Sequence, residues 1–189
     1  RAAAGPVVWC GSGGLGRALA AAAPARSAPR LAGPLLGLFG SDQAATRRQL
    51  AACGAFWLHL DPAEGVARLA AALEARGAAL ASLALPEGLP RAEAARRIAH
   101  SFALLLGALP RPGTLLVAGG ETLAAVCAAL GATMIEADGL VGPGVPRSAI
   151  RGGRWDGVAL VSKSGAFGTD VVWRDLLAAN GFIPEPNPA

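Results

Sequence analysis

Short apolar runs alternate with longer, alanine-rich amphipathic stretches along almost the whole chain, and this alternation constrains the fold more than any other feature. Runs such as residues 34–39 and 114–118 have the length and composition of buried strands, and the stretches between runs carry apolar residues at helical spacing. Strands that alternate with helices predict a mostly parallel sheet covered on both faces. We therefore expect an α/β chain with a three-layer α/β/α arrangement and a doubly wound sheet. No interdomain linker interrupts the pattern, so one domain is expected over residues 1–189.

The boundaries of the expected elements follow from these runs and from the glycines and prolines between them. Strands are predicted at residues 6–10, 34–39, 55–60, 79–85, 114–118, 133–136 and 157–162. Helices are predicted at residues 15–23, 44–53, 64–76, 91–109, 122–130 and 170–180. The strand at 133–136 leads into a Gly/Pro-rich segment, residues 139–146.

Composition and charge exclude two classes of partner. The chain has no uncharged apolar run of about 18 residues, which a transmembrane helix would need, so no membrane association is expected. The net charge is +4, but the basic residues other than Lys163 are arginines scattered along the chain. A nucleic-acid surface would instead show a clustered basic stripe with aromatic residues between the charges, so no nucleic-acid partner is expected.

Cysteine usage and the first residues bear on location and completeness. Cys10, Cys53 and Cys127 lie far apart, and none belongs to a C-x-x-C pair, so their spacing indicates neither a metal site nor a disulfide framework. We expect free buried thiols in the reducing cytoplasm. The chain begins at Arg1 with neither a methionine nor a signal sequence, and we expect it to be an excised part of a longer protein.

Three segments share one local pattern, in which an apolar strand is followed by a glycine turn and then by a helix. The turns lie at residues 11–14, 40–41 and 119–122. Glycine lets the backbone approach a phosphate closely, and the start of the next helix offers free N–H groups and the positive end of its dipole. Ser41 and Thr122 add hydroxyls that can cap a helix or contact a phosphate oxygen. Because ligands of open α/β sheets bind outside the carboxyl ends of the strands, the three turns favour an anion site there.

The first turn also matches the dinucleotide-binding pattern G-x-G-x-x-G through Gly11, Gly13 and Gly16. This pattern requires an acidic residue near the end of the second strand. Asp42 lies near that position, but after a Gly-Ser turn it would more naturally cap a helix. A Rossmann-type NAD(P)-binding oxidoreductase domain is therefore an alternative interpretation.

Residues 161–168, Val-Ser-Lys-Ser-Gly-Ala-Phe-Gly, form the most informative segment. Lys163 follows a predicted buried strand, has a serine on each side and precedes Gly165 and Gly168. Such a loop can bind phosphate, and the other interpretation is a solvated lysine in a strand-to-helix turn. Because Lys163 is the only lysine in an arginine-rich chain, a need for a compact ammonium group is indicated.

At these residues the sequence resembles the C-terminal nucleotide-binding domain of the four-carbon acid sugar kinases, a family long known as a domain of unknown function. The resemblance covers nearly the whole chain, with motifs in the same order at residues 11–15, Gly40-Ser41 with Thr46 and Gln49, and residues 119–122, 143–146 and 162–168. Members of the family use ATP to phosphorylate the terminal hydroxyl of acids such as threonate, erythronate or 3-oxo-tetronate. The resemblance therefore implies ATP and Mg²⁺ as cofactors and a small sugar acid as substrate.

The resemblance also implies that the ATP site is lined by Ser41, Gly119, Gly120, Glu121, Thr122, Lys163 and Gly165. Backbone N–H groups at Gly119 and Gly120 would hold phosphate, and Thr122 would contact phosphate or a hydrated Mg²⁺ ion. Glu121 would face Mg²⁺, the ribose or a backbone N–H, or would instead complement the helix dipole. Lys163 would offset the charge of the phosphates or support the loop.

Two departures from the family pattern matter. After Gly40-Ser41 the family usually continues with Arg and Ser before Pro, whereas Asp42-Gln43-Ala44 follows here and places an acidic residue near the expected phosphates. The family's substrate-binding N-terminal domain, with its Asp-Asp-x-Thr-Gly motif, has no counterpart in these residues. That upstream domain is expected to supply the sugar-acid site and the catalytic base.

No catalytic residue is predicted within the chain. His59 and His100 are the usual acid–base candidates, but both lie outside the glycine turns, and structural or surface roles are expected for them. The isolated chain is therefore expected to be inactive. A non-catalytic nucleotide-binding module is a further alternative.

Overall fold

The computed structural model describes residues 6–11, 13–19, 30–41, 43–61 and 64–183. The strands are β1 (Leu35–Phe39), β2 (Trp57–Leu60), β3 (Ala78–Leu83), β4 (Thr114–Ala118), β5 (Met134–Gly142), β6 (Val145–Arg151) and β7 (Ala159–Lys163). The helices are α1 (Gly13–Leu19), α2 (Ala44–Ala51), α3 (Gly65–Arg76), α4 (Arg91–Ala108), α5 (Gly120–Leu130) and α6 (Val172–Ala179), and a short 3₁₀ helix at Gly54–Phe56 precedes β2.

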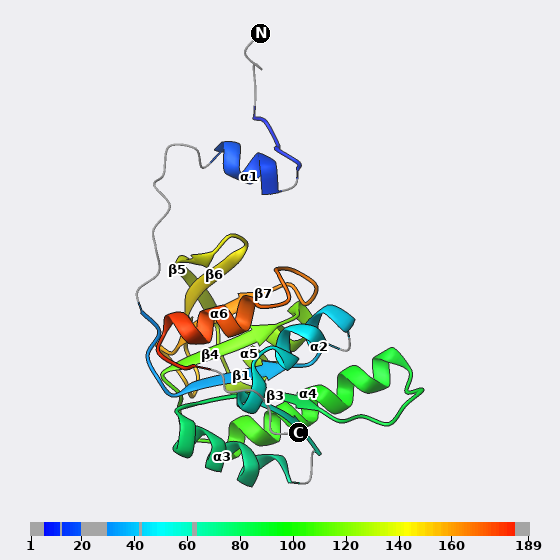
Figure 1. The fold of residues 1–189 in the computed structure, drawn as a ribbon. Helices are drawn as coiled ribbons and strands as arrows, with labels where there is room; N and C mark the ends of the chain where they lie inside the picture. Colours follow the sequence, from blue (N-terminus) through cyan, green and yellow to red (C-terminus); the bar gives the residue numbers. More distant parts are fainter. Residues whose placement is uncertain (1–5, 12, 20–29, 42, 62–63, 184–189) are drawn as a thin grey trace.

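All seven strands belong to one sheet, in the order β2-β3-β1-β4-β7-β6-β5 (Figure 1). The first five strands in this order are parallel, and β6 is antiparallel to both β7 and β5. Helices cover both faces of the parallel part, with α2 and α6 in contact on one face and α3, α4 and α5 packed together on the other. The predicted three-layer α/β/α arrangement with a mostly parallel sheet is confirmed.

The alternation of side chains along β1 shows why the sheet needs both helical layers. Leu36 and Leu38 belong to the core that includes residues of α3, α4 and α5, whereas Leu35 and Phe39 belong to the core that includes residues of α2 and α6. A Cβ atom at Gly37 would lie 2.5 Å from Cδ2 of Leu80, so the absence of a side chain there is a packing requirement. Strands buried on both faces are continuous apolar runs, which is why the sequence marks them clearly.

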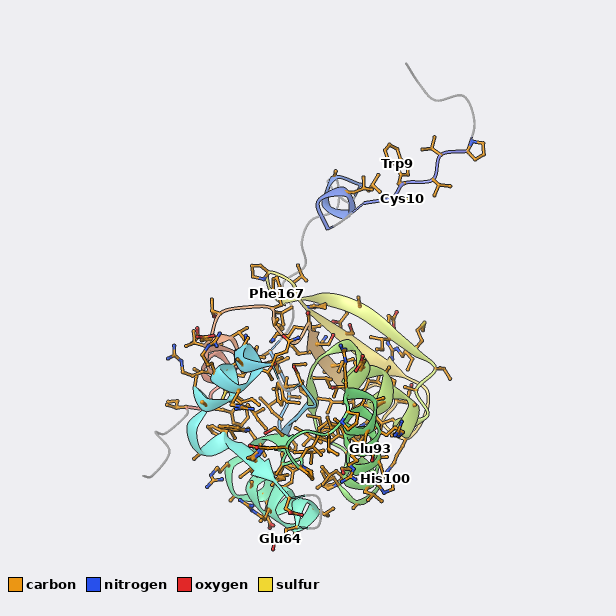
Figure 2. The ribbon with its side chains drawn as sticks, turned by 90° about the vertical axis from the view of Figure 1, so that its right-hand side faces the viewer. Trp9, Cys10, Glu64, Glu93, His100 and Phe167 are labelled. Carbon is orange, nitrogen blue, oxygen red and sulfur yellow. The ribbon has the colours of Figure 1, made fainter. Side chains whose placement is uncertain are left out.

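The predicted strand at residues 6–10 does not form. Val8 and Trp9 are 86% and 64% exposed, and no described residue between 6 and 19 is buried. Figures 1 and 2 show this segment and α1 apart from the sheet. An apolar run becomes a strand only when a neighbouring strand takes its backbone hydrogen bonds, and the described residues offer none here. The helix predicted at 15–23 is described only as far as Leu19, because residues 20–23 lie outside the described ranges.

The structure also differs from the prediction at the Gly/Pro-rich segment, residues 139–146, which forms strand rather than loop. β5 is nine residues long and pairs with β6 as an antiparallel hairpin whose turn contains Pro143 and Gly144. Gly144 has φ 68°, a conformation that favours glycine. The pairing shifts register twice, between Ala137 and Gly139 and between Leu140 and Gly142. The prolines and glycines conceal these strands from a periodicity analysis, since bulges interrupt the alternation.

The sheet has a topological switch point between β1 and β4. These two strands are neighbours, α2 leaves the carboxyl end of β1 toward one face, and α5 leaves the carboxyl end of β4 toward the other. Helices that diverge in this way leave a crevice at the edge of the sheet, where ligands of such folds bind. None of the helices in the described ranges has the length and apolarity to cross a lipid bilayer.

Candidate functional site

The turn after β4 presents an uncapped helix end to open space. Gly119 has φ 101° and ψ 131°, which strongly favours glycine, and its N–H donates to the carbonyl oxygen of Lys163 at 3.0 Å. No side chain caps α5, so its first turn keeps N–H groups without intrahelical acceptors. A Cβ atom at Gly120 would meet no atom within 4 Å. The positive end of the α5 dipole is therefore accessible.

The turn after β1 lies against this helix end. Phe39, the last residue of β1, is in register with Ala118 of β4. A Cβ atom at Gly40 would lie 2.5 Å from Oγ1 of Thr122 and 2.8 Å from Cγ2 of Ile98, so only glycine fits between them. The Gly40-Ser41 turn and the Gly119–Thr122 turn thus meet at the switch point.

The loop after β7 completes the site, and α2 holds it in place. A Cβ atom at Gly165 would lie 3.0 Å from Oγ of Ser41, which brings the loop against the β1 turn. Thr46 donates from Oγ1 to the carbonyl oxygen of Gly165 at 3.1 Å, and Gln49 donates from Nε2 to the carbonyl oxygen of Phe167 at 3.1 Å. Both donors are fully buried, so these hydrogen bonds tie the loop firmly to α2.

Lys163 is directed into its own loop. It is 6% exposed, and its ammonium group donates to the carbonyl oxygens of Ser164 and Gly165 at 3.0 and 2.9 Å. Nζ also lies 5.5 Å from the centroid of the Trp173 ring, within the range of a cation–π interaction. Burial lowers the pKa of Lys163 to about 8. In this geometry Lys163 stabilises the loop from inside.

Glu121 faces a cation that the sequence analysis missed. Its carboxylate pairs with the guanidinium of Arg91 at 3.0 Å, and both side chains are largely exposed. Arg91 begins α4, so the pair places a positive group beside the start of α5. The two residues are 30 positions apart, and only the packing of α4 against α5 brings them together.

Several sequence candidates lie away from this site. Gly11, Gly13 and Gly16 belong to the exposed segment before residue 20, so the strand and sheet that the dinucleotide pattern requires are not formed around them. Asp42, which would decide how acidic the β1 turn is, lies outside the described residues.

The two histidines are also remote from the glycine turns. His59 lies on the edge strand β2, with Nδ1 3.0 Å from Oγ of Ser82, and β3 and β1 separate it from β4. His100 is exposed on α4, and Figure 2 shows it far from Phe167, which lies in the loop after β7. Neither histidine contributes to the site.

The oxygen donors at the turns suit a hydrated Mg²⁺ ion that arrives with a phosphate. Ser41, Glu121 and Thr122 supply hydroxyl and carboxylate oxygens, which are the ligands that Mg²⁺ prefers. Within the described ranges, no group of three or more His, Cys, Asp and Glu side chains could hold a metal ion. A magnesium ion here would therefore be held jointly by the protein and by phosphate oxygens.

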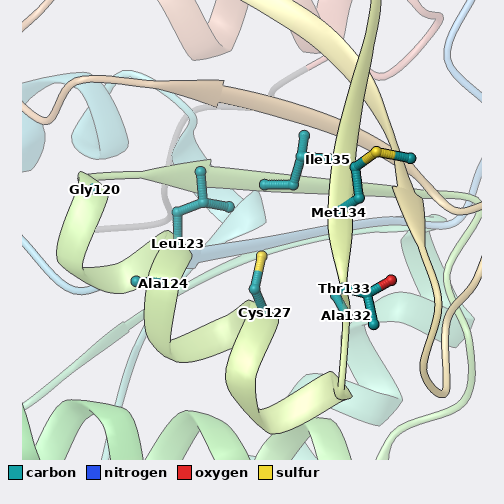
Figure 3. A pocket seen from close by; sticks show the side chains of 8 residues that line it. All are labelled: Gly120, Leu123, Ala124, Cys127, Ala132, Thr133, Met134 and Ile135. Atoms are coloured by element: carbon teal, nitrogen blue, oxygen red, sulfur yellow. The ribbon is translucent and has the colours of Figure 1, made fainter.

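An apolar pocket of about 390 Å³ opens beside Gly120 (Figure 3). One wall is formed by Gly120, Leu123, Ala124 and Cys127 of α5, and the other by residues 132–135 at the start of β5. The sequence analysis missed this pocket, because no local pattern shows how far β5 stands from α5.

Comparisons with known proteins place the chain among nucleotide-binding domains. The family model described as the nucleotide-binding C-terminal domain matches residues 36–172. A solved structure of a domain of unknown function from Bordetella bronchiseptica, a domain-swapped dimer with bound citrate, is 34% identical with a TM-score of 0.58. The match covers 84% of this chain and 41% of that chain.

A protein from Haemophilus influenzae with the same domain of unknown function has a TM-score of 0.60. Its identity is 21%, so it supports the fold alone, and the match covers 82% of this chain and 42% of that one. The present chain thus spans about two fifths of the length of these solved proteins. No curated protein matches it.

Proposed function

Because the chain belongs to the family of nucleotide-binding C-terminal domains, we propose that it is the ATP-binding half of a kinase that phosphorylates a four-carbon sugar acid at its terminal hydroxyl. The acid is of the threonate, erythronate or 3-oxo-tetronate type. The observation that carries the proposal is the convergence of two glycine turns and the Lys163 loop around the uncapped start of α5. Free N–H groups, a helix dipole and neighbouring hydroxyls are the features that hold phosphate.

The geometry changes the role of individual residues in the proposed site. The N–H of Gly119 already donates to Lys163, so the N–H groups of Gly120 and Glu121 would hold the phosphates instead. Ser41 and Thr122 would add their hydroxyls, and Gly165 keeps the space beside Ser41 open. Lys163 would contribute mainly by fixing the loop.

Phosphoryl transfer at such a site relies on positioning and on electrostatic stabilisation. Mg²⁺, when bound, would neutralise charge on the β- and γ-phosphate oxygens. Thr122 and the carboxylate of Glu121 are the side chains that would orient it, and the pairing with Arg91 keeps this carboxylate from repelling phosphate unopposed. Residues of this chain would thus bind and orient ATP, while a base for the attacking hydroxyl would come from elsewhere.

The acid and the base belong, in this proposal, to an upstream substrate-binding domain. The chain spans only 41% of the Bordetella protein, and the exposed segment at 6–19 carries Val8 and Trp9, which a folded protein would normally bury. We expect this segment to pack against the upstream domain, with the reaction in the cleft between the two domains. The isolated chain would then bind nucleotide without catalysing transfer.

Calorimetry with ADP–Mg²⁺ and with NAD(P) tests the nucleotide class. We expect ADP–Mg²⁺ to bind, and Gly120→Val to weaken it at least tenfold, which is about 1.4 kcal/mol. Gly107→Val is the matched control, because Gly107 is also an exposed helical glycine with no atom within 4 Å of a Cβ. Lys163→Ala should weaken ADP less than Gly120→Val does, through a loosened loop. Tight NAD(P) binding without ADP–Mg²⁺ binding would refute the proposal.

A non-catalytic nucleotide-binding module is the remaining alternative, and the longer protein tests it. The upstream region should be restored and four-carbon acids assayed with ATP–Mg²⁺. Phosphorylation of one of them is expected. A folded full-length protein that binds ATP but phosphorylates none of these acids would favour the module.

A further inference from the structure

The pocket between α5 and β5 shares one residue with the proposed phosphate site. Gly120 forms the first turn of α5 and also lines the pocket. The other lining residues of α5 are Leu123, Ala124 and Cys127, which lie on the same helical face at spacings of three and four. A ligand with phosphates at the helix start can therefore extend along this face of α5.

The walls of the pocket suit an uncharged, flat group. Leu123, Ala124 and Ile135 are apolar, and none of the lining side chains is charged. Neighbouring side chains of a strand point to opposite faces, and Figure 3 shows Ile135 on the side of β5 that faces α5 and Met134 on the other side. The hydroxyl of Thr133 already donates to the carbonyl oxygen of Arg151 at 3.2 Å, so it adds no free donor to the pocket. Phosphates would lose hydration here without compensation, whereas an aromatic heterocycle would gain contacts.

The strand that forms the second wall is open to a ligand. Met134 and Ile135 are 56% and 38% exposed, so in the described part of the chain nothing covers them. β5 is the last strand of the sheet, and its outer edge carries backbone N–H and C=O groups that no strand of the described sheet pairs. Such groups can bond the polar edge of a heterocyclic base. The volume of about 390 Å³ lies in the range of small-molecule sites.

We propose that this pocket binds the nucleobase of the nucleotide whose phosphates lie at the start of α5. The assignment rests on the proposed function, because it places the base relative to the proposed phosphate site. Apolar contacts along α5 and β5 would then supply affinity that the phosphate contacts alone lack.

A substitution within the pocket separates base binding from phosphate binding. Ala124 is exposed, so Ala124→Phe should fill the pocket without disturbing the core. Ala129→Phe is the matched control, because Ala129 is also exposed on α5 but does not line the pocket. The ligands are ADP–Mg²⁺ and inorganic tripolyphosphate with Mg²⁺, titrated by calorimetry. Ala124→Phe should weaken ADP at least tenfold and leave tripolyphosphate unchanged, and Ala129→Phe should leave both unchanged.

The outcomes distinguish a failure of the pocket assignment from a failure of the proposed function. If the wild-type chain binds ADP and Ala124→Phe binds it equally well, the pocket assignment is overturned and the proposed function stands. A wild-type chain that does not bind ADP–Mg²⁺ at all overturns both.

Cys127 gives an independent readout in the pocket wall. Cys53 is fully buried with its pKa raised by burial to about 12, and Cys10→Ser removes the exposed thiol, so Cys127 becomes the reporter. Burial also raises the pKa of Cys127, and alkylation is best followed at mildly alkaline pH. ADP–Mg²⁺ should slow alkylation of Cys127 several-fold, and tripolyphosphate should not. An alkylation rate that saturating ADP leaves unchanged would overturn the assignment.

Discussion

Residues 6–19 and 35–51 carry the same local pattern, an apolar run followed by a glycine turn and a short helix, but they end in different states. In the second unit, β1 is completely buried between β3 and β4, and α2 packs on the sheet. In the first unit, the apolar run is exposed, and none of the α1 residues whose burial is described is buried. The glycines of the first unit match the better-known motif, yet only the second unit contributes to a candidate site.

The difference shows what a glycine turn needs in order to bind a ligand. Ser41 is placed by neighbours that are distant in sequence, since Gly165 lies against its side chain and Thr122 lies against Gly40. Within the described ranges, a Cβ atom at Gly16 would meet no atom within 4 Å, and the three atoms nearest to a Cβ atom at Gly11 all belong to Leu15 of its own unit. Ligands of open α/β sheets bind outside the carboxyl ends of the strands, where the second unit has its turn, whereas the turn of the first unit follows no strand of the described residues.

The largest expected contrast concerns the apolar runs themselves. Leu38→Ala should lower the free energy of unfolding by about 2–5 kcal/mol, because Leu38 is fully buried and its truncation leaves a cavity. Val8→Ala should change it by less than about 0.5 kcal/mol, as for other exposed positions. Urea denaturation followed by circular dichroism measures both. Equal losses would show that residues 6–11 pack on the sheet in solution, so that the two units would not differ.

The next contrast concerns the glycines of the turns. Gly119→Ala should cost about 1–3 kcal/mol, because φ of 101° strains any residue with a side chain. It should also weaken ADP, since the turn orients the start of α5. Gly16→Ala should be neutral for stability and for ADP, because a Cβ there meets no atom within 4 Å. Weaker nucleotide binding in Gly16→Ala would revive the dinucleotide-binding alternative.

The pH dependence of stability tests the loop after β7, which holds the β1 turn and α2 of the second unit in place. The pKa of Lys163 is lowered from 10.5 to about 8, so between these values the unfolded chain binds a proton that the folded chain lacks. The contribution of Lys163 to the free energy of unfolding should therefore rise from pH 8 to pH 10.5. Urea denaturation of the wild type and of Lys163→Met at each pH should show a difference that follows this rise.

Subtracting the stability of Lys163→Met from that of the wild type removes an opposing effect of Cys53 on the pH dependence. The pKa of Cys53 is raised from 9.0 to about 12, so the stability that this thiol contributes is lost as the pH rises above 9. Cys53 is present in both proteins and cancels. A difference that stays flat across this range would mean that the Lys163 ammonium group is solvated in solution.

The smallest effect is expected for Arg91→Ala. The ion pair with Glu121 is exposed, and such pairs contribute about 0–1 kcal/mol. Thermal unfolding should change little, and the small change should vanish at high salt. A loss of unfolding free energy comparable to that of Leu38→Ala would indicate that other parts of the chain bury the ion pair of Arg91 and Glu121.

Most of the fold could be predicted from the sequence, because parallel strands buried on both faces are uninterrupted apolar runs. The strand predicted at 114–118 is observed with identical bounds, and the helix predicted at 91–109 ends one residue earlier. The strand predicted at 133–136 is the start of β5, but the continuation of β5 to Gly142 and all of β6 were missed, since the hairpin alternates irregularly around Pro143 and Gly144. The prediction of a strand at 6–10 was wrong, because the segment has the apolar pattern of a strand but, in the described part of the chain, no neighbouring strand to pair with.

The candidate site was accessible to sequence analysis only in part. The glycine turns and the Lys163 loop are local signals, and the structure brings Ser41, Thr122 and Gly165 together. The pocket beside Gly120 and the pairing of Arg91 with Glu121 have no local signal, because each depends on the distance between elements that are far apart in sequence.

Which segments can form strands and helices, and where the backbone must be glycine, follows from the amino-acid sequence, since these depend on side-chain size, apolarity and local dihedral angles. The tertiary structure decided which of the similar turns meet. It also turned Lys163 inward, toward the carbonyl groups of its own loop, and opened an apolar pocket beside the start of α5. Those outcomes depend on strand order and on the packing of distant helices, which decide the partner that each backbone group finds and leave N–H groups free at the start of α5.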